Sequence, residues 1–163
     1  MSDLTHLDAN GEARMVDVGA KPVNERRAVA EGRIHLNEAA FQAVEAGELK
    51  KGDALATARI AGIMGGKRTS ELVPLCHPLP LSHLEVHLTL EHPLSTIRCT
   101  AEAATTGQTG VEMEALSAVQ VALLTVYDMC KGHDRGMTIH DVALVAKSGG
   151  QSGDYQRPET TRT

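Results

Sequence analysis

Aromatic side chains are almost absent from this chain, which has no tryptophan, one phenylalanine and two tyrosines in 163 residues. It also lacks a basic excess, because 16 lysines and arginines stand against 21 aspartates and glutamates. A mildly acidic chain with so few rings is a poor candidate for nucleic-acid binding. The three cysteines are odd in number and widely spaced, which argues against a disulfide framework and fits a reducing compartment.

Long apolar runs and a leader pattern are missing as well. No apolar stretch approaches the roughly 18 residues that a membrane span needs, so we expect no membrane association. The N-terminus has no basic segment followed by an apolar one, which is the pattern of a secretory signal. We therefore expect a soluble, cytoplasmic protein.

The length predicts one domain, and the composition adds an extension at each end. Residues 1–25 are polar and interrupted by glycine, and we expect an extended arm there. Residues 26–147 carry the periodic apolar patterns of a single domain. Residues 148–163 are first rich in glycine and serine and then polar, which predicts a tail that is disordered over 155–163.

Apolar periodicity predicts a strand, two helices, a hairpin, a long helix and a last strand, in that order. The predicted ranges are 26–36, 38–46 capped by Asn37, a helix capped by Asp53, 84–91 with 96–105, 111–131 and 137–147. Gly65 and Gly66 should weaken or break the second helix, at about 1 kcal/mol per glycine relative to alanine. This order is that of an α+β, ferredoxin-like (split βαβ) fold, with helices on one face of an antiparallel sheet.

The predicted helix over 111–131 is apolar around most of its circumference. A helix of this kind is buried on several sides, which in so small a domain implies contact with another subunit. A core with few rings also gains less from burial per residue. Both observations predict an oligomer.

The dipeptide Gly66-Lys67 resembles part of a phosphate-binding P-loop but does not complete one. Ala61 stands where the motif needs its first glycine, and Arg68 stands where it needs serine or threonine. The basic pair of Lys67 and Arg68 is then either a simple positive charge for a phosphate or a solvated turn.

His83, Glu85 and His87 share one face of a predicted strand. The two histidines are four residues apart, roughly 13 Å along a strand, which is too far for them to share one ion. We expect a solvated face at this place and no metal site.

Two segments carry side chains suited to binding a ligand. Cys76 and His77 lie between two prolines, on a stiff loop of the kind that presents binding residues well. Glu112 and Glu114 open the long helix, where the helix dipole alone would also favour carboxylates.

Asp128 and Lys131 are three residues apart near the end of the long helix and share a face. They form either a surface ion pair or a carboxylate and an amine for proton transfer, and their apolar neighbours suggest partial burial. Lys51 precedes a helix N-terminus, where a cation is unfavourable unless an anion such as phosphate joins it.

Several uncommon blocks, taken together and in this order, resemble the cyclic pyranopterin monophosphate synthase family, the C proteins of molybdenum cofactor biosynthesis. The resemblance extends from about Met15 to Asp154. Gly65 and Gly66 stand where two alanines are expected, and Ser117 stands where a threonine is expected. The blocks are Lys51–Ile63, Lys67–Leu72, Pro74–Leu79, Thr109–Leu116, Tyr127–Lys131 and Lys147–Gly150.

The resemblance implies a lyase that acts on a small molecule derived from GTP. Its substrate would be (8S)-3′,8-cyclo-7,8-dihydroguanosine 5′-triphosphate, its product cyclic pyranopterin monophosphate, and diphosphate would leave. The family also implies a ferredoxin-like subunit in a homohexamer built as a trimer of dimers. No cofactor is required, and a role for Mg²⁺ alongside the triphosphate stays open.

The resemblance also assigns roles to particular residues. Asp128 would be the catalytic residue, and Lys51 and Lys131 would be amines on which turnover depends. The positive charges would stabilise the departing diphosphate. The expected substrate-binding residues are Leu75, Cys76, His77, Glu112, Met113, Glu114, Lys67 and Arg68.

These residues cannot all meet within one chain if the long helix is straight. Glu114 and Asp128 would lie about 21 Å apart along its axis. Two such helices packed antiparallel across a two-fold axis would bring them together, so we expect active sites at a dimer interface.

Two other classes of function remain open at this point. An oligomeric nucleotide-binding regulator without turnover shares the fold class but has no need to place Asp128 beside Lys131. A purely structural subunit would not depend on Lys51.

Overall fold

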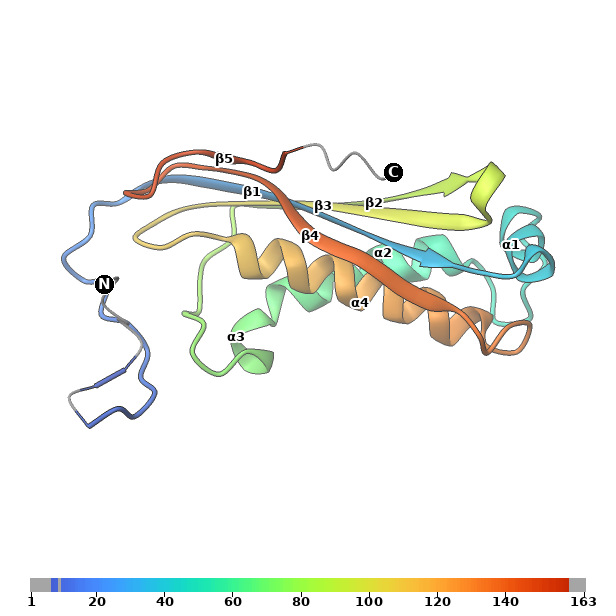
Figure 1. Cartoon of the computed structure of the whole chain (residues 1–163), viewed down its shortest axis with the longest axis horizontal. Helices are drawn as coiled ribbons and strands as arrows, with labels where there is room; N and C mark the ends of the chain where they lie inside the picture. The colour runs from blue at the N-terminus through green and yellow to red at the C-terminus, as the bar shows by residue number, and fades with distance from the viewer. Residues whose placement is uncertain (1–6, 9, 159–163) are drawn as a thin grey trace.

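The computed structural model describes residues 7–8 and 10–158, and its strands form one open antiparallel sheet (Figure 1). The strand order across the sheet is β2-β3-β1-β4-β5, and each neighbouring pair is antiparallel. The strands are β1 (Asn24–His35), β2 (His83–Glu91), β3 (Thr96–Gly107), β4 (Thr138–Ser148) and β5 (Tyr155–Gln156).

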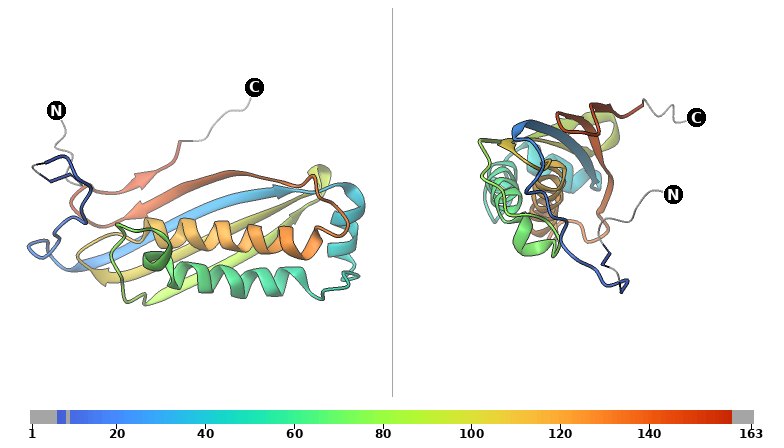
Figure 2. Two further views of the ribbon diagram at one scale, coloured as in Figure 1. Left: turned by 90° about the horizontal axis from the view of Figure 1, so that it is seen from below. Right: turned by 90° about the vertical axis from the view of Figure 1, so that its left-hand side faces the viewer.

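Helices cover one face of this sheet (Figure 2). Helices α2 (Ala54–Lys67) and α4 (Glu112–Cys130) lie side by side along it, and the short α3 (Thr69–Leu72) follows α2. Helix α1 (Glu38–Glu45) lies at the end of the sheet where the 3-10 turn η1 (His92–Leu94) joins β2 to β3. The element order and the sheet order confirm the predicted ferredoxin-like α+β fold.

Strand β2 shows how the alternating sequence becomes a strand with two different faces. Val86 is buried toward the helices, whereas His83, Glu85 and His87 are exposed on the other face. Glu85 lies between the two histidines, with an oxygen 2.9 Å from His87 Nε2 and another 3.7 Å from His83 Nε2. The predicted solvated face is confirmed.

Both predicted helix caps are present. The side chain of Asn37 accepts a hydrogen bond from the N–H of Ala40 at 2.8 Å, and that of Asp53 accepts one from Ala56 at 2.9 Å. Each cap satisfies an N–H group that has no partner within its helix. Helices α1 and α2 therefore begin where the sequence predicts.

Gly65 and Gly66 do not break α2, contrary to the prediction. The helix continues to Lys67, and both glycines are buried. A Cβ at Gly65 would lie 2.6 Å from a methyl carbon of Val121 on α4, and one at Gly66 would lie 2.7 Å from a methyl carbon of Leu84. Close packing of α2 against α4 and β2 therefore offsets the low helix propensity of glycine.

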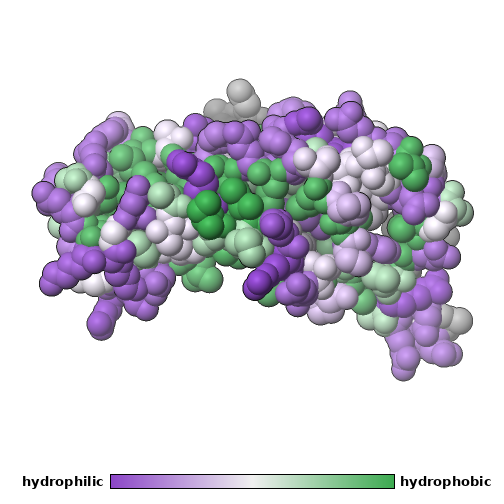
Figure 3. All heavy atoms as spheres, turned by 180° about the vertical axis from the view of Figure 1, so that it is seen from behind, coloured by the Kyte–Doolittle hydropathy of each residue, from purple (hydrophilic) through white to green (hydrophobic). Residues whose placement is uncertain are grey.

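Helix α4 is the centre of the hydrophobic core. By length and mean hydropathy alone it would suit a membrane span, but it packs on the sheet and alongside α2 as a core helix does. Not all of its apolar surface is covered, because Leu124 is exposed, as is Ile60 on the neighbouring α2. Figure 3 shows a further apolar area across the face that α2 and the edge strand β2 form.

The C-terminal tail is more ordered than predicted. Tyr155 and Gln156 form β5, which pairs with the end of β4, and the N–H of Arg157 donates to the main-chain oxygen of Val145 at 2.7 Å. A two-residue strand is too short to leave a periodic pattern in the sequence. The prediction of disorder is therefore wrong for 155–156, and residues 159–163 lie outside the described part, as do residues 1–6 and 9 of the arm.

Candidate active site

Three charged residues meet at the C-terminal end of α4. Lys51 comes from the loop before α2, whereas Asp128 lies in the last turn of α4 and Lys131 follows it. Lys131 Nζ is 2.7 Å from Asp128 Oδ1, and Lys51 Nζ donates to Asp128 Oδ2 at 2.8 Å. Lys51 Nζ also donates to the main-chain oxygen of Asp128 at 2.9 Å. We call this cluster the Asp128 half-site.

The two ammonium groups decide the charge of Asp128. The hydrogen bond from Lys131, and then that from Lys51, hold the pKa of Asp128 at about 2, so it is ionised at neutral pH. The partial burial expected for Asp128 is wrong for the single chain, because its side chain is 54% exposed. The cluster is thus a preformed, solvent-facing set of one carboxylate and two cations.

The opposite end of α4 carries the other predicted site residues. Cys76 Sγ lies 3.7 Å from Glu114 Oε1, and His77 Nε2 lies 2.7 Å from the main-chain oxygen of Val16. Since a carbonyl oxygen only accepts, Nε2 of His77 carries a proton. A cavity of about 480 Å³ opens here, and the arm supplies part of its wall. Its lining includes Leu75, Cys76, His77, Glu112, Met113, Val16, Val18 and Lys21.

Glu114 is the buried acid beside this cavity. It is 3% exposed, and burial raises its pKa above the ordinary value. Its Oε2 is buried and has no hydrogen-bond partner in the described part of the chain. Burial, and then the nearby Glu114, raises the pKa of the Cys76 thiol to about 11, so Cys76 is a poor nucleophile at neutral pH. We call Leu75–His77 with Glu112–Glu114 the Glu114 half-site.

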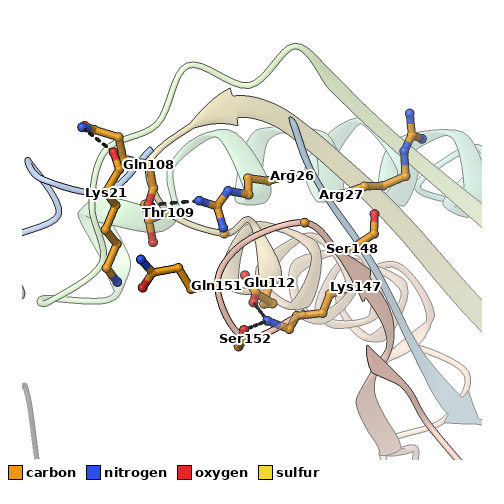
Figure 4. Close-up of a pocket in the computed structure, with 12 residues that line it drawn as sticks. Lys21, Arg26, Arg27, Gln108, Thr109, Glu112, Lys147, Ser148, Gln151 and Ser152 are labelled. Carbon is orange, nitrogen blue, oxygen red and sulfur yellow. Dashed lines mark hydrogen bonds and ion pairs between the residues drawn. The ribbon is translucent and has the colours of Figure 1, made fainter. Parts of the chain in front are cut away.

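A cationic pocket lies next to the Glu114 half-site, and the sequence analysis did not identify it. The pocket measures about 320 Å³, and Lys21, Arg26 and Lys147 line it from the arm, the start of β1 and the end of β4 (Figure 4). Glu112 Oε1 lies 3.5 Å from Lys147 Nζ, which also bonds to Ser152. Arg27 also lines the pocket but is paired with Glu102, so one carboxylate stands among four cations and the pocket favours an anion.

Arg26 is the buried cation of this pocket. It is 7% exposed, and its guanidinium reaches the main-chain oxygens of Gly107 and Gln108 at 3.4 Å. Within the described residues no carboxylate pairs with it. The turn at Gly149 and Gly150 passes over Arg26 with φ of 84° and 89°, and a Cβ at Gly150 would collide with the guanidinium. These glycines allow the turn to cover a cation that is otherwise only partly satisfied.

Lys67 and Arg68 do not line the cationic pocket. Both are exposed at the end of α2, and Lys67 lines a separate hollow with His83 and Leu84. Their contact with phosphate stays a prediction. Across the described residues, no group of three or more histidine, cysteine or acidic side chains is placed to hold a metal ion.

The two half-sites lie at opposite ends of an unbroken helix. Helix α4 has 19 residues, and the step from Glu114 to Asp128 corresponds to about 21 Å at 1.5 Å per residue. Figure 2 shows α4 running straight beside α2, with α3 at one end and α1 at the other. The helix does not fold back on itself, so one chain does not bring Asp128 to Glu114.

The model of the MoaC family matches residues 15–150, a span that holds both half-sites and the cations of the pocket. The chain belongs to the MoaC family. A relative from Roseiflexus castenholzii, named cyclic pyranopterin monophosphate synthase, is 58% identical over 94% of this chain and 98% of its own length. One from Heliobacterium modesticaldum with the same name is 54% identical over 98% of this chain and 100% of its own. The family resemblance of the sequence blocks is confirmed.

Proposed function

We propose that this chain is a lyase that converts (8S)-3′,8-cyclo-7,8-dihydroguanosine 5′-triphosphate into cyclic pyranopterin monophosphate and diphosphate, in molybdenum cofactor biosynthesis. The observation that carries the proposal is the nearly full-length match to relatives named cyclic pyranopterin monophosphate synthase. The Asp128 half-site adds to it, because a sensor without turnover has no need for two cations held on one carboxylate.

The reaction requires two kinds of chemistry. The guanine imidazole ring must be opened by hydrolysis and reclosed as a pterin, which moves protons on and off nitrogen and carbon. A ribose oxygen must then attack the α-phosphorus, and the bond to the diphosphate breaks. Positive charge near the departing diphosphate lowers the barrier of this second part.

The Asp128 half-site supplies proton donors and cations. Because Asp128 is ionised at neutral pH, it is a proton acceptor and an anchor for the two ammonium groups rather than a proton donor. Lys51 and Lys131 are then the groups that donate protons to the opening ring or stabilise negative charge on it. Their hydrogen bonds to Asp128, 2.7–2.9 Å long, hold both amines in place before substrate arrives.

The Glu114 half-site recognises the base. The unpartnered Oε2 of Glu114 is suited to accept from the N1 and N2 donors of guanine, which adenine lacks. The triphosphate would extend toward Lys21, Arg26 and Lys147 in the adjoining pocket. In this arrangement the triphosphate would pair with the buried guanidinium of Arg26, which forms no ion pair in the described part of the chain.

One complete site requires two copies of the chain. Packing α4 of one copy antiparallel to α4 of another across a two-fold axis would set the Asp128 half-site of each against the Glu114 half-site of the other. It would also cover Ile60 and Leu124, which are 62% and 60% exposed in the single chain. Three such dimers make the expected homohexamer, a cytoplasmic enzyme without nucleic-acid or membrane partners.

The decisive experiment is to incubate the purified chain with the cyclised dihydro-GTP and follow pterin and diphosphate. We expect both products in equal amounts, without any added cofactor. A parallel reaction with EDTA tests whether Mg²⁺ assists the triphosphate. Unchanged substrate at saturating concentration, with and without Mg²⁺, would contradict the proposal.

A further inference from the structure

Gln108 connects the N-terminal arm to the loop between β3 and α4. Its Nε2 donates to the main-chain oxygen of Gly19 at 2.9 Å and to that of Lys21 at 3.1 Å. Both hydrogens of the side-chain amide are therefore used on the arm. The dashed contact in Figure 4 shows the Gln108 amide beside the main chain of Lys21.

The arm has few other attachments to the domain. Within the described residues, three hydrogen bonds join residues 15–21 to the rest of the chain, and Gln108 makes two of them. The third is the contact between His77 Nε2 and the main-chain oxygen of Val16. The segment forms no strand with the sheet, so its position depends on these few side-chain contacts.

The same residue also supports the buried cation of the pocket. The main-chain oxygen of Gln108 accepts from Nη2 of Arg26, and that of the preceding Gly107 accepts from Nε of Arg26. The side chain of Gln108 thus fixes Lys21 and its main chain fixes Arg26. Lys21 and Arg26, which lie on the arm and on β1, therefore line the same pocket and are both held by Gln108.

We propose that Gln108 is a positioning residue, which orders the arm so that Lys21 and Arg26 bind a polyphosphate together. The identity of the anion rests on the proposed function, whereas the ordering of the arm by Gln108 is independent of it. An amide is needed at this position, because a carboxylate of the same shape has no N–H to donate and would face two carbonyl oxygens.

The first test measures the arm without any ligand, by hydrogen exchange of a peptide that covers residues 15–21. Gln108→Glu removes both donors, and Gln108→Met removes them without adding charge. Gln151→Glu adds the same charge to the same pocket from a side chain that makes no hydrogen bond to the described residues of the arm. Gln42→Glu is a surface control on α1.

We expect exchange of the arm to rise about tenfold in both Gln108 variants, as for the loss of two hydrogen bonds, and to stay unchanged in both controls.

The second test measures how the same variants bind diphosphate and use the substrate. We expect Gln108→Met to raise both the Kd for diphosphate and KM about tenfold while kcat changes less than about twofold, because ordering of the arm affects ground state and transition state alike. Gln151→Glu should weaken diphosphate binding through charge while the arm stays protected.

Unchanged exchange of residues 15–21 in both Gln108 variants would overturn the inference, whatever the enzyme does. So would faster exchange accompanied by unchanged diphosphate binding. If the wild-type protein forms no pterin, the proposed function fails, while hydrogen exchange and diphosphate binding still decide the role of Gln108.

Discussion

The two ends of α4 place carboxylates in opposite surroundings. Asp128 is half-exposed, lies between two ammonium groups and has a lowered pKa, whereas Glu114 is buried, has a raised pKa and leaves one oxygen without a partner. At the exposed end two ammonium groups are bonded to the carboxylate, whereas at the buried end the carboxylate bonds to the Cys76 thiol and lies beside a cavity that Lys21 helps to line. The exposed end supplies charged groups for proton transfer and the buried end supplies a cavity for a ligand, which is the physical reason to regard them as two halves of one site.

The largest effect should come from removing the amines of the exposed end. We expect Lys51→Ala and Lys131→Ala each to lower kcat by about 1,000-fold or more, because each loses a proton donor and a charge that act mainly in the transition state. KM should change much less, and thermal melting should stay normal because both side chains reach solvent. Lys50→Ala, one residue from Lys51, is the matched control and should retain activity. Normal turnover in either of the two variants would show that the amine it lacks is not required, and would contradict the role given to the exposed end.

Close packing of α2 supports the helix that separates the two ends. We expect Gly65→Ala to lower the free energy of unfolding by about 1–3 kcal/mol, since a Cβ there would overlap Val121 and overpacking outweighs the better helix propensity. Gly132→Ala, which points into open space, should change stability by less than about 0.5 kcal/mol. Chemical denaturation at fixed protein concentration measures both, and a stabilised Gly65→Ala protein would contradict the packing account.

The two carboxylates should give stability opposite dependences on pH. The pKa of Asp128 lies below its unfolded value of 3.8, so its ion pairs contribute fully above about pH 4 and are lost as the pH falls through about 2. The stability difference between wild type and Asp128→Asn should therefore be flat from pH 8 to 5 and shrink only below about 4.

The pKa of Glu114 is raised above 4.5, so the folded state holds its proton more tightly than the unfolded chain. Its ionisation costs stability as the pH rises, and Glu114→Gln should gain on wild type above about pH 4.5. Unfolding titrations of both pairs of proteins check the two signs. The same slope for both carboxylates would show that their surroundings do not differ.

The smallest effect should come from the thiol at the buried end. With a pKa of about 11, roughly one Cys76 side chain in ten thousand is a thiolate at pH 7. We expect Cys76→Ser to keep kcat within about threefold, and alkylation of Cys76 to be slow at this pH. Cys99 and Cys130 are buried, with their pKa values raised to about 12 and 11, and should also stay unreacted. A covalent substrate adduct found on any of the three by mass spectrometry would refute this.

Much of the fold could be predicted because it rests on local patterns. Alternation in β2 and capping by Asn37 and Asp53 are properties of a few consecutive residues, and both were correct. The prediction of a helix break at Gly65 and Gly66 was wrong, because the sequence shows only the low helix propensity of glycine. The close approach of Val121, which requires a small residue at position 65, is a property of the packed helices. Strand β5 was not predicted, because its two residues are held by pairing with β4 and not by an apolar pattern of their own.

The candidate site shows the same division between local and distant contacts. The ion pair of Asp128 with Lys131 follows from a spacing of three residues, and the Glu114 half-site follows from compact blocks of sequence. The cationic pocket joins the arm, β1 and β4, so no spacing could reveal it. One signal was available, since Arg26 occupies an inward position on a strand whose next inward residues are Ala28 and Ala30. A cation in that pattern needs either an acid or a ligand.

The most direct test of the two-half account is complementation between dead variants. Homo-oligomers of Asp128→Ala and of Glu114→Ala should each be inactive, because every site lacks one half. Refolded together in equal amounts with random pairing, they should recover activity in about a quarter of the sites, since one chain can supply an intact Asp128 half-site and its neighbour an intact Glu114 half-site. No recovery, with mixed oligomers verified by mass spectrometry, would show that each site is built from one chain and would contradict the account.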